Sequence, residues 1–182
     1  MEHMEVLMRA AVLTMCMLGV ALPAAAQTAS VITPPPPVKS VNLSGPRFGF
    51  TQLSQGVVDK LQQERGITVK SGISQFGWQF EKQFYSKPSG IAAVNEFVFL
   101  LGGLEQGVVL PSASWIVGLR SPTGLEFGIG PNITPAGVAL AIAGGVTFRS
   151  GALNVPVTFA VVPSQAGTRV SMLTGFNFRG RR

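Results

Sequence analysis

Bulky apolar residues alternate with small or polar residues along most of the chain, with the period of two that is typical of β-strands. Residues 73–85 show the pattern well, because Phe76 and Trp78 fall on one side while Gln79 and Glu81 fall on the other. Repetition of this pattern predicts eight strands, of which the first is the least clearly marked. The predicted strands are residues 47–53, 73–85, 92–104, 108–120, 124–130, 136–149, 153–162 and 168–178.

The charged exterior of an ordinary soluble β-protein is missing from this pattern. Only five residues between positions 90 and 167 are charged, namely Glu96, Glu105, Arg120, Glu126 and Arg149. Three of them, Arg120, Glu126 and Arg149, fall on the side of the small residues. A sheet closed on itself in lipid explains this arrangement, because its large side chains meet acyl chains and its narrow interior holds glycine, alanine and paired charges. We therefore predict a mainly β protein, a closed antiparallel up-and-down β-barrel of about eight strands with one short amphipathic helix.

The helix is predicted over residues 54–66. Val57, Val58 and Leu61 lie on one side of it, polar residues cover the rest, and Gly66 suits its C-terminal stop. A helix of this kind can lie on a membrane surface, plug or cap a barrel, or pack on the edge of a sheet. The last two placements are favoured together.

The N-terminal region has the order of an export signal. In residues 1–26, Arg9 precedes an apolar run over 10–22, and three alanines follow at a site suited to a signal peptidase. The run is shorter than the roughly 20 residues that a membrane-spanning helix needs. Residues 27–45 contain four consecutive prolines and are predicted to form an extended Pro-rich linker. The β-barrel domain is expected over 46–182.

Removal of the signal takes away Cys16 and His3, the only cysteine and the only histidine. Disulfides, zinc sites built on these residues and Ser-His or Cys-His nucleophile pairs are then unavailable. The acidic residues that remain are scattered, so no catalytic residue, metal site or cofactor is predicted and the chain is not expected to be an enzyme. The polar residues expected to face the lumen are Gln79, Glu81, Arg120, Glu126 and Arg149. Arg120 and Glu126 flank a turn and are expected to pair diagonally.

The chain is basic, with 14 Lys and Arg residues against 8 Asp and Glu residues and a formal net charge of +6. Nucleic acid is not expected as a partner, because the basic residues are spread along a chain that is expected to be exported. A basic exported surface is matched more simply to anionic lipid. Membrane lipid and a small apolar ligand are the expected partners, and the sequence names no protein partner.

The C-terminal strand alternates Val170, Met172, Phe176 and Phe178 and closes on an aromatic residue. In this it resembles small bacterial outer-membrane β-barrel proteins of the eight-stranded type, and the resemblance extends as a pattern over residues 73–178. It implies a barrel in the outer membrane of a Gram-negative bacterium and no particular activity.

Three features depart from that pattern. The sequence runs four residues past Phe178, to Arg182, where the family usually stops at the aromatic residue. Pro111 and Pro156 fall inside predicted strands, where each removes a hydrogen-bond donor, so bulges or edges are expected there. Residues 92–104 are apolar on both sides, which suits a doubly buried strand or an apolar lumen.

Three functions follow as hypotheses. The first is a non-enzymatic outer-membrane barrel, either structural or binding a small apolar ligand, and too narrow for an open aqueous channel. The alternative is a soluble periplasmic β-barrel or sandwich that binds lipid, with the same strands but with the large apolar residues turned inward. An outer-membrane enzyme is disfavoured, because no spacing of carboxylates nominates a catalytic pair.

Overall fold

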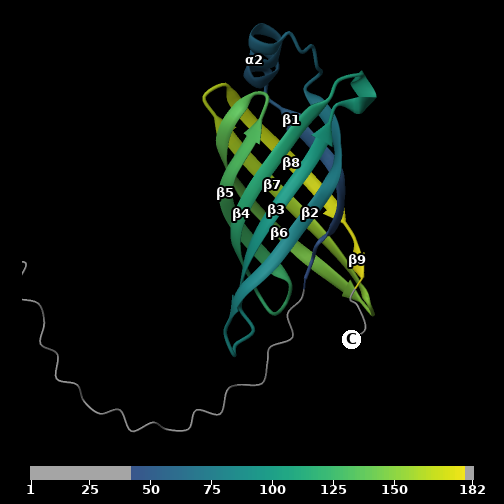
Figure 1. Ribbon diagram of the computed structural model, residues 1–182, viewed down its shortest axis with the longest axis vertical. Coiled ribbons are helices and arrows are strands. Elements are labelled where there is room, and N and C mark those ends of the chain that lie inside the picture. Colours follow the sequence, from purple (N-terminus) through teal and green to yellow (C-terminus); the bar gives the residue numbers. More distant parts are fainter. Residues whose placement is uncertain (1–41, 179–182) are drawn as a thin grey trace, which may run out of the picture. The chain divides into compact units, whose positions relative to one another are not determined.

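The computed structural model describes residues 42–178 (Figure 1). The predicted signal peptide and residues 27–41 of the predicted linker lie outside the described residues. Within this range the helical elements are α2 (Gln55–Arg65) and the 3-10 turn η1 (Leu104–Gln106). The strands are β1 (Gly45–Leu53), β2 (Gly72–Ser86), β3 (Ala92–Gly102), β4 (Leu110–Arg120), β5 (Leu125–Thr134), β6 (Gly137–Ser150), β7 (Leu153–Ser164), β8 (Gly167–Gly175) and β9 (Asn177–Phe178).

The strands form one closed antiparallel sheet. Each strand from β1 to β7 pairs with the next along the chain, and β8 pairs with β1 to complete the cylinder. The short β9 continues β8 against β7 in the same register after an interruption at Phe176. The predicted eight-stranded up-and-down barrel is confirmed, including its first strand.

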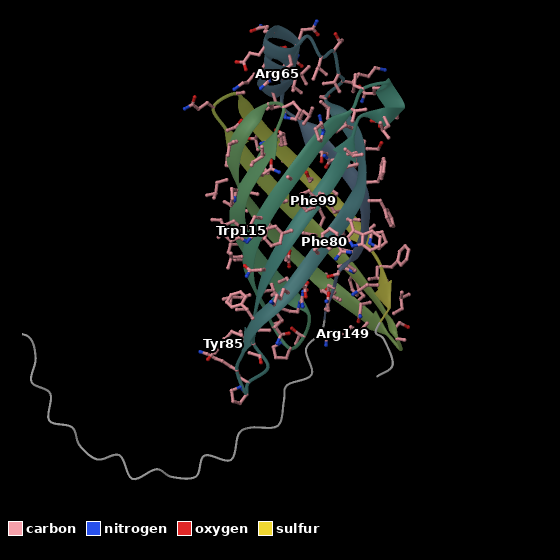
Figure 2. All side chains as sticks on the ribbon, viewed as in Figure 1. Arg65, Phe80, Tyr85, Phe99, Trp115 and Arg149 are labelled. Atoms are coloured by element: carbon pink, nitrogen blue, oxygen red, sulfur yellow. The ribbon has the colours of Figure 1, made fainter. Side chains whose placement is uncertain are left out.

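The large apolar side chains point out of the cylinder. Trp78, Phe127 and Phe159 keep 46%, 60% and 54% of their surface exposed. Figure 2 shows Phe80, Phe99 and Trp115 on the outer wall, where the ring of Trp115 stacks on that of its cross-strand neighbour Phe97. The inner side carries glycine, alanine and polar residues, as predicted, together with a set of buried aliphatic residues that includes Val98, Ile116 and Leu173.

β3 is apolar on both sides because the lumen beside it is apolar, which is one of the two explanations that the sequence left open. Val94, Val98 and Leu100 are buried inside the barrel, while Phe97 and Phe99 are exposed outside it. The inner side of this strand therefore makes part of the lumen apolar, and the strand is not covered on both faces.

The prolines within strands do not produce the expected bulges. Pro111 and Pro156 are paired in register with β3 and β6, and no register shift occurs at either residue. The N–H group of a residue in an antiparallel sheet points to one neighbouring strand only, so a proline weakens one ladder and leaves the other intact. Pro131 in β5 shows this directly, because it pairs with Leu140 of β6 at a position where the ladder to β4 is interrupted.

Helix α2 lies over one end of the barrel (Figure 1). Its buried residues Val57 and Leu61 pack against Leu53, Ile73 and Leu110 at the ends of three strands. The helix ends at Gly66, whose left-handed backbone (φ 65°) lets its N–H group bond back to the last turn. Of the placements considered for this helix, on a membrane surface, as a plug or cap, or on a sheet edge, the structure shows the cap. Within residues 42–178, no helix is long and apolar enough to cross a membrane.

Candidate functional site

A cluster of charged side chains fills the lumen at the end away from α2. Arg120, the last residue of β4, binds both carboxylate oxygens of Glu81, with Nη1 to Oε1 at 2.7 Å, and donates Nε to Glu126 Oε1 at 2.6 Å. Only 3% of the Arg120 side chain and none of the Glu81 side chain is exposed. Arg120 and Glu126 stand directly opposite each other on β4 and β5, not diagonally as expected. The pairing itself is confirmed, and it leaves this end of the lumen packed with neutralised charge.

The segment before β1 is tied into the same cluster. Leu43 has no exposed surface, its N–H group bonds Glu81 Oε1 at 3.2 Å, and Arg47 Nη2 donates to its carbonyl oxygen at 2.6 Å. Arg47 also donates Nε to Gln79 Oε1 at 3.0 Å. The predicted linker extended to residue 45, but its last residues are packed rather than extended spacer, because buried polar groups of the barrel bind their backbone. Residues 42–44 therefore form a plug at this end.

A cavity of about 100 Å³ lies in the lumen between the plug and α2. Most of its wall is apolar, and it reaches from Val57 and Leu61 of the cap to Arg47 and Glu96 near the charged cluster. The apolar residues along its length include Val98, Leu100, Ile116, Ala141, Val162 and Leu173.

Arg169 of β8 lines this cavity at the end nearer α2. It keeps only 6% of its surface exposed, and its backbone partner on the neighbouring strand β1 is Leu53. Its Nη1 donates to Thr134 Oγ1 at 2.5 Å, but its Nε is buried without a hydrogen-bond partner. No carboxylate among residues 42–178 forms an ion pair with it.

The outer wall carries a groove beside the cavity. Five residues line both the groove and the cavity, so the two hollows lie on opposite sides of the same part of the wall. They are Leu100, Pro111, Ser112, Thr134 and Pro135.

Outside the lumen, Glu105 in η1 fastens the β3–β4 connection to β2. Its carboxylate accepts hydrogen bonds from the Ser74 hydroxyl and from the Ser74 N–H group, the latter at 2.9 Å. These bonds lower the pKa of Glu105 from 4.5 to about 2.

Acid should therefore release this connection. Because the pKa is depressed in the folded state, its stabilisation is present above pH 4.5 and is lost as the pH falls towards 2. We expect Glu105→Gln to lower the urea midpoint of unfolding at pH 7, and the gap from the unaltered protein to close near pH 2. A gap of constant size across this range would contradict the assignment.

No protein-family model and no curated protein sequence matches the chain. Among solved structures, it is similar to Ail, the attachment invasion locus protein of Yersinia pestis, in complex with the heparin analogue sucrose octasulfate. The sequences are 10% identical, the TM-score is 0.29, and the match covers 76% of this chain and 99% of Ail. A likeness at this level carries no argument about function, and the strand pairing alone establishes the barrel.

The structure brings together most of the predicted lumen residues. Gln79, Glu81 and Arg120 are buried in one network, and Glu126 is partly buried beside them. Arg149 is instead exposed near the end of β6, where its Nη1 donates to the Pro122 carbonyl at 3.4 Å (Figure 2).

Sequence reasoning did not select Arg47 and Arg169 as lumen residues. The signal was present for Arg169, which alternates onto the same side as Leu173 and Gly175. Its lack of an acidic partner depends on contacts between distant strands and is visible only in the fold. Within the described range, no group of three or more His, Cys, Asp or Glu residues could hold a metal ion.

Proposed function

We propose that this protein spans a bacterial outer membrane and holds a small apolar ligand in its closed lumen. The observation that carries the first half is the apolar exterior, to which every strand of the closed sheet contributes. Soluble monomers seldom expose apolar patches larger than a few hundred Å². The outward residues include Phe48, Trp78, Phe97, Trp115, Phe127, Leu140, Phe159 and Met172, one from each of β1 to β8.

Strand length supports the same placement. A tilted membrane-spanning strand needs roughly 9–11 residues, and the strands of the closed sheet have between 9 and 15. Outer-membrane barrels have short periplasmic turns and longer extracellular loops. By that rule α2 faces the outside of the cell and the plug of residues 42–44 faces the periplasm.

The closed lumen supports binding rather than conduction. The cap packs at one end of the lumen and the plug at the other, and the cavity between them is mostly apolar. Such a cavity favours an apolar ligand over a stream of hydrated solutes. The alternative of a soluble lipid-binding barrel requires the large apolar residues to face inward, and the outward direction of Trp78, Phe127 and Phe159 argues against it.

Fractionation tests the location. In a Gram-negative host expressing the full chain, we expect the processed protein in the outer-membrane fraction. It should be released only by detergent and should migrate faster on a gel when it is not heated. Planar bilayers containing it should show no porin-like conductance. Recovery of the mature protein from the soluble periplasmic fraction without detergent would contradict the proposal.

A further inference from the structure

We propose that the lumen ligand is a short unbranched amphiphile with a carboxylate head, and that Arg169 binds this carboxylate. This inference rests on the proposed ligand-binding function and names the chemistry of the ligand. It starts from the buried guanidinium of Arg169, which forms no ion pair with a carboxylate among residues 42–178.

A guanidinium taken out of water costs free energy unless an anion or several acceptors compensate it. Arg169 is 6% exposed, and its guanidinium donates a hydrogen bond to the neutral hydroxyl of Thr134. The buried Nε–H group has no acceptor. An oxyanion in the cavity would supply both the missing acceptor and the missing charge.

The other buried arginines do not share this condition. Arg120 is bound by two carboxylates. Arg47 donates to Gln79 and to the carbonyl groups of Leu43 and Pro46, and it lies near the carboxylates of Glu81 and Glu96. Among residues 42–178, Arg169 has no such carboxylate near it. One guanidinium without a nearby carboxylate matches a ligand with one negative charge, because a dianion such as phosphate would bring a surplus charge into an apolar lumen. This favours a carboxylate.

The cavity beyond Arg169 sets the rest of the ligand. A volume of about 100 Å³ corresponds to roughly seven to ten water-sized atoms. It therefore matches an unbranched carboxylate of about six to eight carbons. Val162, Leu173 and Ile116 offer the tail an apolar path away from the arginine. The site thus joins one cationic end to an apolar slot.

The source of such a ligand follows from the segments that lie at the two ends of the barrel. The cap and the plug obstruct entry along the barrel axis. The outer groove, by contrast, shares wall residues such as Pro111 and Thr134 with the cavity and opens onto the apolar exterior. An amphiphile dissolved in the surrounding lipid is adjacent to this shared part of the wall. A free hydrophilic anion is not.

Octanoate and 1-octanol, each labelled with carbon-13 at the first carbon, are suitable probes because they differ in the charge of the head. The full chain is placed in lipid nanodiscs, and saturable binding is followed by NMR against empty nanodiscs. We expect octanoate to bind more tightly than octanol. Arg169→Gln should weaken octanoate binding about 10- to 100-fold and leave octanol binding unchanged.

Arg149→Gln is the matched control, because it removes the same charge from an exposed arginine and should leave both probes unaffected. Retained octanol binding shows that the R169Q barrel is folded. If the R169Q barrel does not fold, Arg169→Lys is the second variant. It keeps the charge and loses the planar fork of the guanidinium, so it should weaken the binding of octanoate and not that of octanol.

Three results would overturn the inference. Equal binding of octanoate to the unaltered and R169Q proteins removes Arg169 from the site, while octanol binding leaves the proposed function standing. Acetate binding as tightly as octanoate identifies a site for free small anions. If neither octanoate nor octanol binds saturably, the result contradicts both the inference and the proposed ligand-binding function.

Discussion

Replacement of Arg120 by methionine is expected to lower the free energy of unfolding by about 3–5 kcal/mol. The loss is large because Arg120 is the shared partner of Glu81 and Glu126, and Glu81 has no exposed side-chain surface. Without the guanidinium, Glu81 is left as a buried charge with no cation bonded to it. Urea unfolding of the protein in detergent micelles, followed by tryptophan fluorescence, measures the change.

The double variant Arg120→Met with Glu81→Met is the control for this effect. When both partners of a buried ion pair become apolar, the cost of an isolated charge disappears, so the double variant should recover a large part of the lost stability. A loss below about 1 kcal/mol in the single variant is the magnitude of an exposed pair. It would mean that water reaches the cluster and that this end of the lumen is open.

The second large effect is expected on the outer wall. Ile129 lies outward in the middle of β5, and Ile129→Arg should destabilise a membrane-embedded barrel by about 2–4 kcal/mol. Leu125→Arg, on the same face at the start of the same strand, should cost only about 0–1 kcal/mol because the charge reaches the interface. Unfolding and refolding in lipid vesicles measure both values.

The difference between these two positions tests the bilayer directly. In a barrel surrounded by water, both arginines would be surface substitutions with effects within about 0.5 kcal/mol of zero. Equal and small effects at Ile129 and Leu125 would therefore contradict the membrane placement, whatever the fold.

The alternation of side chains determined most of what could be predicted. It located the strands because a period of two requires no knowledge of distant contacts, and the scarcity of charge indicated which side faces outward. The two sides of β3 were ambiguous on sequence, since Val98 and Phe99 are both apolar. Closure of the sheet resolves this by giving the larger aromatic residues the outside, where there is room for them.

The candidate site was harder to predict because its members come from distant parts of the chain. Arg120 and Glu126 were found because a short turn brings them together. Leu43 was assigned to a spacer, since nothing local shows that Arg47 and Glu81 bind its backbone. The alternation in β8 puts Arg169 on the inner side, but its missing partner is a property of all the strands around it.

The link between Asn177 and Asn42 has a consequence for assembly. Asn177, just after the final strand of the closed sheet, donates Nδ2 to the carbonyl oxygen of Asn42 at 2.6 Å, across 135 positions of sequence. The contact cannot form until the first and last strands have zipped together. In a partly inserted intermediate, water should therefore reach the lumen through this end of the barrel. Water should be excluded from the lumen only in the last step of assembly, when the barrel closes.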